Sequence, residues 1–594
     1  MVIKSHVICL EDESSGEVSA LKKLFLILLI SLISIALIAE EPEYKVEEYS
    51  GGKYGGMLYV GTISGPKTLN PSTAYETSST DIIGWFLDGL VDFDKNGKIV
   101  GGALAKEWEI SPDGKSYIFK IRKGLKWSDG HPFTAEDVYF TFKEIWTNKE
   151  LAGNHYDGLL GPDGNPPSVE LIDEYTVKIS YNEPFAPGLR YVGSEPILPK
   201  HVVEPLVKEG KWLESWTVAD VDKIVGMGPF IPVEYTPDVR VVLKRNPNYY
   251  RVDKDGNRLP YLDGIVYVII PDMNTMRLKF ETGDLDVYAP RAQDYPDLKA
   301  MAREKGWVVD VDGPTFGTQF FVFNWNALDP IKRKWFRNVH FRRAVAYALD
   351  KDTIIETIYN GLGTPQYGPV SAASPFYNPE IEEKYPYPYS LTLAKIELKR
   401  GGFSWNEEGK LVDSEGNPVK FTLTTNAGNT VREDMCNIIT ESLKKLGMDV
   451  TFSPIDFNTL VQKLLNTGDW EMVMIGLTGG VDPHGGSNVW KLDGALHFWN
   501  YSPERKKYVD PNDYWVPDFE KRIDEIFRLE VGEMDPEKRR ALFDEFQELV
   551  AENLPLIYTA QRLYMFAYKK ILHNLDPAAW GGMLWNGYAI WKEQ

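Results

Sequence analysis

The sequence predicts a mixed α/β protein that is divided into two or three lobes. The chain has 594 residues, which is more than one ordinary hydrophobic core accommodates. Residues 57–63 and 117–124 alternate apolar and polar side chains, as short strands do. Other segments carry the start signals and the periodicity of amphipathic helices, so both kinds of element contribute.

Four segments predict helices. Thr134 is an N-cap candidate and predicts a helix over residues 134–145. Residues 341–349 and 431–446 are further candidates, and residues 536–553 form the clearest one because the segment opens with proline. The apolar stripe expected on this last helix comprises Ala541, Leu542, Phe546, Leu549 and Val550.

The composition of the chain narrows the classes of ligand that it could bind. The chain has 86 acidic and 65 basic residues, a formal net charge of −21, which argues against binding nucleic acid or anionic lipid. Aromatic residues make up 13% of the chain, including 17 tryptophans. Large cores account for many of these rings, and a pocket for a sugar or another amphipathic solute is the alternative for some of them.

Only two cysteines are present, Cys9 and Cys436. Cys9 precedes the export signal described below, so we expect no internal disulfide in the mature protein and no cysteine-based metal site. We expect no cofactor and no catalytic activity. A secreted hydrolase stays as a remote alternative, which would need two carboxylates at a fixed separation.

The amino-terminal region has the pattern of an export signal. Lys22 and Lys23 precede sixteen uncharged residues, 24–39, and an acidic stretch follows. A membrane anchor is the alternative, although sixteen residues fall short of the ~17–25 of a spanning helix. We therefore interpret residues 1–39 as a signal region cleaved near Ala39, residues 40–54 as a loose leader, and the mature protein as periplasmic or otherwise extracytoplasmic.

One stretch resembles a known family. Residues 104–140 are similar to the signature of the family 5 extracellular solute-binding proteins, which serve bacterial ABC importers of dipeptides and oligopeptides. The likeness extends from about residue 55 to residue 591, with further similar segments at 55–100, 226–250, 341–355 and 535–570. The residues of the signature are Trp108, Asp113, Gly114, Tyr117, Phe119, Arg122, Gly124, Trp127, Asp129, Gly130, Thr134, Ala135, Asp137 and Val138.

The resemblance implies a periplasmic-binding-protein-like fold: two α/β lobes around a cleft, joined by crossing strands, with an extra α+β domain inserted in the first lobe. Residues 317–326 and 554–565 are the candidate crossing strands because both are dense in strand formers. The expected division is lobe I at 55–85, 205–325 and 560–594, the insert at 86–204, and lobe II at 326–559.

The resemblance also implies the function: a monomer captures a solute by hinge closure and delivers it to the membrane permease subunits of an ABC importer. Peptide-binding members hold the peptide amine with an aspartate four residues before a proline. Here Pro483 is preceded at that distance by Gly479. A buried ammonium without a carboxylate is costly, so this difference favours a neutral solute.

Amide, imidazole and indole groups alternate in the same region, a combination suited to a sugar. We therefore expect a neutral, β-linked oligosaccharide, with a peptide as the alternative. For Trp490 and Trp499, burial in the core is an equal alternative to ligand contact. The candidate ligand-binding residues are Asn324, Trp325, Asn326, Gly479, Asp482, His484, Trp490, His497, Trp499, Asn500, Trp580 and Trp585.

The export signal gives a first testable prediction. We expect exported protein to lack residues 24–39, because the signal is removed during secretion. Intact-mass measurement or amino-terminal sequencing of the secreted material checks this. A chain that keeps residues 24–39 and stays in the membrane fraction contradicts it.

Overall fold

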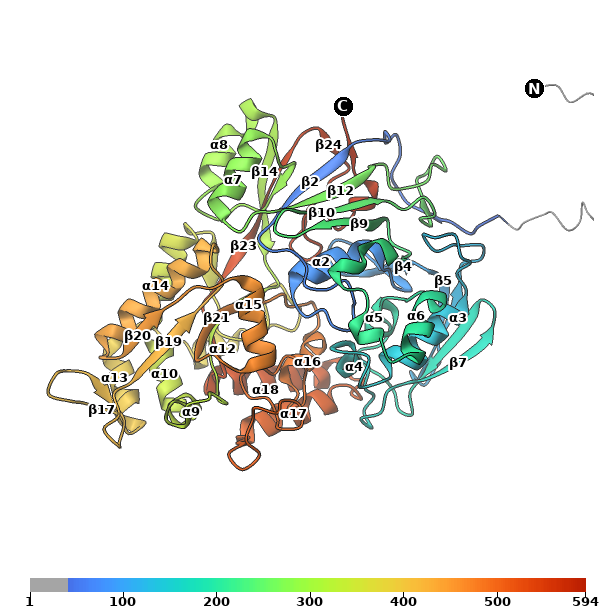
Figure 1. The fold of residues 1–594 in the computed structure, drawn as a ribbon. Helices are drawn as coiled ribbons and strands as arrows, with labels where there is room; N and C mark the ends of the chain where they lie inside the picture. The colour runs from blue at the N-terminus through green and yellow to red at the C-terminus, as the bar shows by residue number, and fades with distance from the viewer. Residues whose placement is uncertain (1–40) are drawn as a thin grey trace, which may run out of the picture. The chain divides into compact units, whose positions relative to one another are not determined.

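The structure, a computed structural model, describes residues 41–594. The predicted export signal and Cys9 lie outside the described residues. Residues 44–594 form one compact unit (Figure 1). Within the described part of the chain, no helix is both long enough and apolar enough to cross a membrane.

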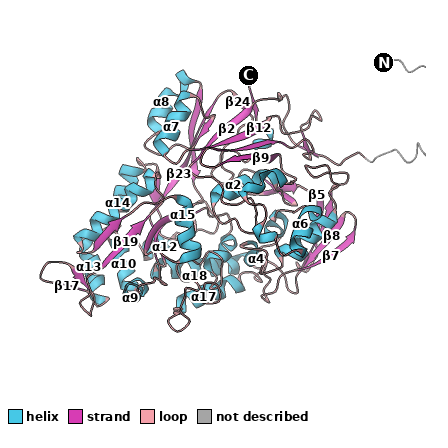
Figure 2. Ribbon diagram, viewed as in Figure 1, coloured by secondary structure: helices cyan, strands magenta, loops and turns pink. Residues whose placement is uncertain are grey.

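The larger sheet is mixed and has eight strands, with the order β14-β23-β13-β2-β12-β10-β9 and β16 paired to β23. The strand predicted at residues 57–63 is β2, which pairs in parallel with β12. Helices α7 (Met273–Thr282) and α8 (Tyr295–Lys305) pack beside β13 and β14 (Figure 2). The strands are β2 (Met57–Thr62), β9 (Phe230–Thr236), β10 (Arg240–Arg245), β12 (Gly264–Ile269), β13 (Val287–Tyr288), β14 (Trp307–Pro314), β16 (Gly363–Pro365) and β23 (Ala560–Lys569).

The second sheet has five strands in the order β20-β19-β21-β15-β22. Its strands are β15 (Thr318–Phe323), β19 (Lys420–Thr424), β20 (Asp449–Phe452), β21 (Met472–Leu477) and β22 (Leu556–Tyr558). The helices of this region are α9 (Pro330–Arg337), α10 (Val339–Tyr347), α11 (Lys351–Thr353), α12 (Glu380–Lys384), α13 (Leu391–Arg400), α14 (Thr430–Lys445), α15 (Phe457–Gln462), α16 (Ser487–Trp490), α17 (Asp518–Leu529) and α18 (Pro536–Asn553).

The helix predictions in this region are confirmed as α10, α14 and α18, and α18 has the predicted bounds. Its buried face differs from the predicted stripe. Phe546 and Val550 are buried as expected, but Ala541 is exposed. Phe543 and Gln547 also lie on the buried face. The Gln547 side chain can be buried because its amide donates hydrogen bonds to the backbone oxygens of Phe543 and Phe376.

The insert contains a four-stranded antiparallel sheet, β5-β6-β8-β7, and the strand predicted at residues 117–124 is β6. Thr134 caps helix α3 as predicted, in a capping box with Asp137, and the helix continues as a π-helical turn, η1. The elements of the insert are β3 (Val91–Phe93), β4 (Ile99–Gly102), β5 (Ala105–Ile110), β6 (Ser116–Ile121), α3 (Ala135–Phe140), η1 (Thr141–Trp146), α4 (His155–Gly158), β7 (Ser168–Asp173), β8 (Thr176–Ser180), α5 (Leu189–Ser194) and α6 (Lys200–Lys208).

Two short connections lead directly from a strand of one sheet to a strand of the other, as the predicted crossing strands require. The chain also returns to the larger sheet at β16, between β15 and β19. Strand β14 belongs to the larger sheet and β15 to the smaller one, so the first crossing lies at residues 315–317, before the predicted lobe boundary at residue 325. The second crossing is Thr559, between β22 and β23. The other lobe boundaries stay predictions.

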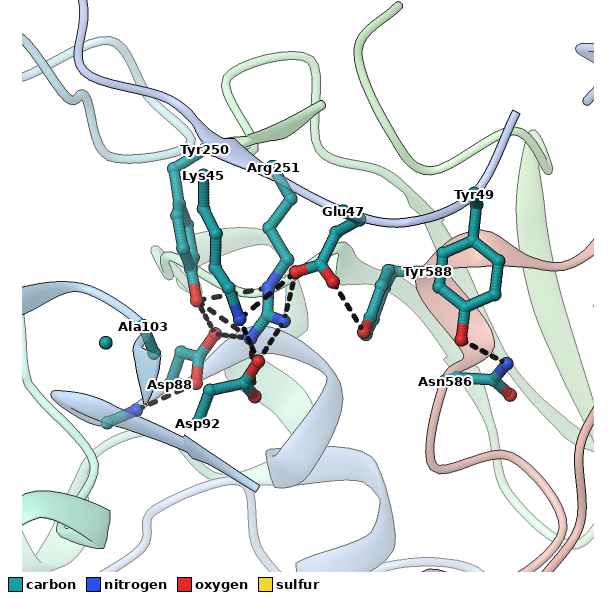
Figure 3. A network of polar contacts seen from close by, with 12 residues as sticks. Lys45, Glu47, Tyr49, Asp88, Asp92, Ala103, Tyr250, Arg251, Asn586 and Tyr588 are labelled. Atoms are coloured by element: carbon teal, nitrogen blue, oxygen red, sulfur yellow. Dashed lines mark hydrogen bonds and ion pairs between the residues drawn. The ribbon is translucent and has the colours of Figure 1, made fainter. Parts of the chain in front are cut away.

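The leader is held in place, contrary to the expectation of a loose segment. Strand β1 (Lys45–Val46) pairs in parallel with β11 (Arg251–Val252). The Arg251 side chain is 5% exposed and donates hydrogen bonds to Glu47 at 2.8 Å and to Asp92 at 3.0 and 3.2 Å. Its guanidinium also lies 4.6 Å from the ring centroid of Tyr588 near the carboxyl terminus (Figure 3). One buried arginine therefore joins the leader, the β3 region and the tail.

This network generates a stability prediction. Replacing Arg251 with glutamine should lower the free energy of unfolding by about 3–5 kcal/mol, because Glu47 and Asp92 would then share Lys45 as their one remaining cation in the network. Arg240→Gln is the control: Arg240 pairs with Glu234 on an exposed surface, and its loss should cost less than about 1 kcal/mol. Denaturant unfolding measures both, and equal losses contradict the assignment.

Candidate functional site

A cavity of about 1000 Å³ lies where the two sheets and the insert meet. The first crossing contributes residues 315–319, and β23 contributes Ala560, Arg562 and Tyr564. The end of β21 and the loop after it contribute residues 475–483, and Trp580 enters from the carboxy-terminal tail. The cavity is therefore built around the two crossings, with walls from both sheets.

Aromatic side chains make up much of the cavity wall. Four of the tyrosines have hydroxyls with no hydrogen-bond partner within residues 41–594: Tyr75, Tyr359, Tyr558 and Tyr564. Burial raises the pKa of Tyr359 to about 12, so its hydroxyl stays protonated and can donate at neutral pH. The full aromatic lining is Tyr75, Phe93, Tyr191, Phe316, Tyr359, Phe457, Trp490, Phe498, Phe546, Tyr558, Tyr564 and Trp580.

Five charged side chains line the cavity: Glu76, Arg190, Arg432, Asp482 and Arg562. Glu76 accepts hydrogen bonds from the Ser79 hydroxyl and, at 3.3 Å, from the Tyr75 backbone N–H. Arg190 donates to the backbone oxygen of Gly97 and lies 5.2 Å from the ring centroid of Phe93.

The loop after β21 is held by a chain of buried charges. Arg539 donates to both oxygens of Asp482 at 2.8 and 3.0 Å and to Glu530 at 2.8 and 3.0 Å. His484 is hydrogen-bonded to Glu530 through Nδ1, and its Nε2 lies 3.0 Å from the backbone oxygen of Gly158 in the insert. The polar side chains that made this loop conspicuous in the sequence are thus engaged in fixing its shape.

The structure brings four of the twelve predicted ligand-binding residues to the cavity. Trp490 is 6% exposed and packs against Trp499 and Phe546, so it presents little of its ring. Trp580 is half-buried beside Phe93, with ring centroids 5.9 Å apart, and is the more accessible indole. The four residues are Gly479, Asp482, Trp490 and Trp580.

The other eight do not line the cavity. Trp499 is 0% exposed and donates to Glu520 at 2.8 Å, and Asn500 donates to the same carboxylate at 2.8 Å. His497 uses Nδ1 to bond the backbone oxygen of Val489 at 2.9 Å. These side chains bond within the core around the five-stranded sheet, where His497 Nε2 and Asn500 Oδ1 are left without a hydrogen-bond partner among the described residues. The eight residues are Asn324, Trp325, Asn326, His484, His497, Trp499, Asn500 and Trp585.

The remaining members of that set have structural partners too. Asn324 donates to two backbone carbonyls just before β21, at 2.9 and 3.0 Å, and Asn326 donates to the Tyr501 backbone oxygen at 3.0 Å. Trp325 between them is fully buried. Trp585 donates to a backbone carbonyl of the tail at 2.5 Å. The two asparagines and Trp585 hold loops together, whereas Trp325 Nε1 and Asn326 Oδ1 have no hydrogen-bond partner among the described residues. None of the four residues lines the cavity.

The cavity residues of β22 and β23 include two tyrosines and one arginine that were not predicted from the sequence. Tyr558, Ala560, Arg562 and Tyr564 all line the cavity at intervals of two residues. This is the spacing by which one face of a strand is exposed. The segment had been predicted as a crossing strand, so its period of two was the signal that could have identified them.

Comparison with known proteins agrees with this architecture. The sequence profile of bacterial extracellular solute-binding proteins, family 5 Middle, matches residues 100–495. A probable ABC transporter-binding protein of Deinococcus radiodurans is 30% identical over 537 residues, covering 86% of this chain and 88% of its own length.

Two solved structures share the fold. The oligopeptide-binding protein AppA of Bacillus subtilis, in complex with a nonapeptide, has a TM-score of 0.75 at 24% identity, over 92% of this chain and 100% of its own. The periplasmic binding protein MelB of Agrobacterium fabrum, in complex with stachyose, has a TM-score of 0.76 at 22% identity, over 91% of this chain and 85% of its own. These matched proteins are solute-binding proteins rather than enzymes. The chain belongs to family 5 of the bacterial extracellular solute-binding proteins.

Proposed function

We propose that this chain is the solute-capturing component of an ABC importer and that its solute is an oligosaccharide. The observation that carries the proposal is the set of four tyrosine hydroxyls without protein partners, together with the half-buried indole of Trp580, in one cavity. A sugar that enters the cavity must exchange water for protein partners, and these free hydroxyls would supply hydrogen bonds to its hydroxyl groups. The apolar face of a sugar ring would stack on the indole.

The size and position of the cavity support capture of an oligomer. Its volume of about 1000 Å³ is at the upper end of the range for small-molecule sites. The lobes are linked by two short crossings at residues 315–317 and 559, an arrangement suited to hinge closure around a solute. The membrane permease subunits would then receive the closed, loaded protein outside the cytoplasm.

The loop after β21 disfavours a peptide held by its amine. Thr478, Gly480 and Val481 carry no charge. Gly479 has φ +67°, and a Cβ at this position would lie 2.0 Å from the backbone oxygen of Phe316. An aspartate cannot be accommodated at residue 479 without moving the backbone, so this position cannot supply the carboxylate that would hold a peptide amine.

A peptide remains the second candidate because of Glu76. Its carboxylate lines the cavity and has no cationic partner among the described residues, so it could receive an amine. Among the residues described here, the cavity's other carboxylate is Asp482, which is bound on both oxygens by Arg539. A hydrolase would need two carboxylates free to act, which disfavours that remote alternative.

The proposal predicts saccharide binding with Trp580 as a stacking platform. We expect calorimetry to show binding of β-linked oligosaccharides of two to five sugar residues. Trp580→Ala should weaken binding by about 2 kcal/mol, or about thirtyfold. Trp585→Ala is the matched control, an indole of the same tail outside the cavity, and should bind normally. Micromolar binding of unmodified tripeptides, with no saccharide bound at millimolar concentration, would falsify the proposal.

The loop gives a separate stability prediction. Gly479→Asp should lower the free energy of unfolding by about 2–4 kcal/mol, because it combines a left-handed backbone with a clash against Phe316. Gly480→Asp introduces the same charge one residue later, where a Cβ meets nothing closer than 3.9 Å, and should cost less than about 1 kcal/mol. Thermal unfolding compares the two, and similar melting temperatures contradict the steric argument.

A further inference from the structure

None of the three cavity arginines has a carboxylate partner among the described residues; Arg190 donates to a backbone oxygen, and Arg432 and Arg562 remain. Arg432 and Arg562 line the cavity, and neither forms an ion pair within residues 41–594. In contrast, the acidic cavity residue Asp482 is neutralised by Arg539. Three arginines and the carboxylate of Glu76, which is unpaired among the described residues, therefore leave an excess of positive charge at the cavity, in a chain whose formal net charge is −21. Withdrawing a charge from water without a partner is unfavourable, so these groups need an explanation.

Arg432 is fixed in place by neutral groups. Its Nε donates to Gln319 Oε1 at 2.9 Å and its Nη1 donates to Asn426 Oδ1 at 2.8 Å, which leaves Nη2 without a partner in the described chain. Burial lowers the pKa of its guanidinium to about 10, so the group is still charged at neutral pH. Arg432 is also the third residue of α14, whose amino-terminal cap Asn429 lines the same cavity. The positive end of the helix dipole adds to the local positive potential.

Arg562 and Tyr359 lie next to each other through strand pairing. Gly363 of β16 is the register partner of Arg562 on β23. A Cβ at Gly363 would lie 2.8 Å from the ring of Tyr359, so this ring packs directly on that glycine. The side chain of Arg562 has no hydrogen-bond partner among residues 41–594 and is half-buried.

Arg432 is the second cation near Tyr359, and it comes from helix α14. Helix α14 packs against η4 (Ile354–Ile358), the π-helical turn that ends immediately before Tyr359. Both guanidiniums interact electrostatically with the Tyr359 hydroxyl and oppose the burial that raises its pKa. Tyr359 is 2% exposed as a whole residue, and its hydroxyl has no partner in the described part of the chain. Two cations and one phenol donor therefore converge on one part of the cavity wall.

We propose that Arg432, Arg562 and the Tyr359 hydroxyl form a subsite for a carboxylate on the solute. This inference rests on the proposed solute-capturing function and revises its chemistry: the solute is an acidic oligosaccharide that carries a uronate, not the neutral one that Gly479 had suggested. A planar guanidinium matches a carboxylate with paired N–H donors, and charge-assisted hydrogen bonds of this kind are about twice as strong as neutral ones. A carboxylate would compensate the charges that the protein leaves unpaired.

The test compares pairs of probes that differ only in the carboxylate. Cellobiouronate and cellobiose form one pair, and aldotetraouronate and its carboxyl-reduced form make a second. Trialanine and trialanine amide form a third pair, in which the carboxylate belongs to a peptide. In calorimetry on the full mature protein, the uronate of at least one sugar pair should bind at least about thirtyfold more tightly than its neutral partner.

Variants assign the effect to the subsite. Arg562→Gln should reduce that preference to less than about threefold, because it removes one of the two cations. Arg432→Lys keeps the charge but loses the planar fork, and it provides a second variant if Arg562→Gln unfolds. Arg303→Gln is the control: it removes one positive charge from the exposed surface of α8 and should leave the preference unchanged. Circular dichroism confirms that each variant is folded.

The outcomes separate this inference from the proposed function. Equal binding of both members of every sugar pair overturns the carboxylate subsite and leaves saccharide capture standing. Binding of trialanine but not its amide, with no saccharide bound, supports the subsite and overturns the oligosaccharide proposal. A preference that Arg303→Gln abolishes as completely as Arg562→Gln overturns the subsite, because the effect is then one of net charge. Binding of no probe in any pair overturns both.

Discussion

Two backbone hydrogen bonds join the segments that pass between the larger and the five-stranded sheets. The Thr315 N–H donates to the Arg562 oxygen at 3.1 Å, and the Thr559 N–H donates to the Gln319 oxygen at 3.0 Å. These bonds keep the two crossings side by side where the chain passes from one sheet to the other. The cavity depends on this arrangement, because residues of both crossings form its wall and the side chains of β23 alternate into it. A hinge located here would move the two lobes while preserving the wall between them.

The loop after β21 shows how a cavity wall can be shaped by side chains that do not line the cavity, here Arg539, Glu530 and His484. Arg539 holds Asp482 and Glu530, and Glu530 in turn holds His484. Each buried charge has a partner, as burial requires. The wall held in this way, residues 475–483, includes three glycines, Gly476, Gly479 and Gly480. The two arginines of the proposed carboxylate subsite, Arg432 and Arg562, lie instead on α14 and β23.

The sequence predicted the fold better than the site. The strands at residues 57–63 and 117–124, the cap at Thr134 and the whole of α18 follow from local periodicity and capping, which are properties of adjacent residues. The family resemblance supplied the two lobes and the crossings. The leader was misjudged because its partner, Arg251, is about 200 residues away, and no local pattern reveals such an ion pair.

The site prediction selected residues by chemical type, and eight of the twelve selected residues do not line the cavity. Asn, His and Trp in a loop are equally suited to binding a sugar and to satisfying buried backbone groups, and Asn324, His497 and Trp499 serve the second purpose. Of the predicted residues, Gly479 and Asp482 of the loop after β21, Trp490 of α16 and Trp580 of the tail line the cavity. Tyr359 and Arg432 could not be assigned from sequence, because η4 and α14 come together only through tertiary packing.

The central claim is that the cavity at the crossings holds an oligosaccharide against Trp580 and the partnerless tyrosine hydroxyls. A crystal structure of the mature protein with a bound saccharide tests it most directly. The account predicts a sugar ring stacked on the Trp580 indole and sugar oxygens within hydrogen-bond distance of the hydroxyls of Tyr359, Tyr558 or Tyr564. A saccharide bound outside this cavity, or one that leaves these hydroxyls and the Trp580 indole without contact, would contradict it.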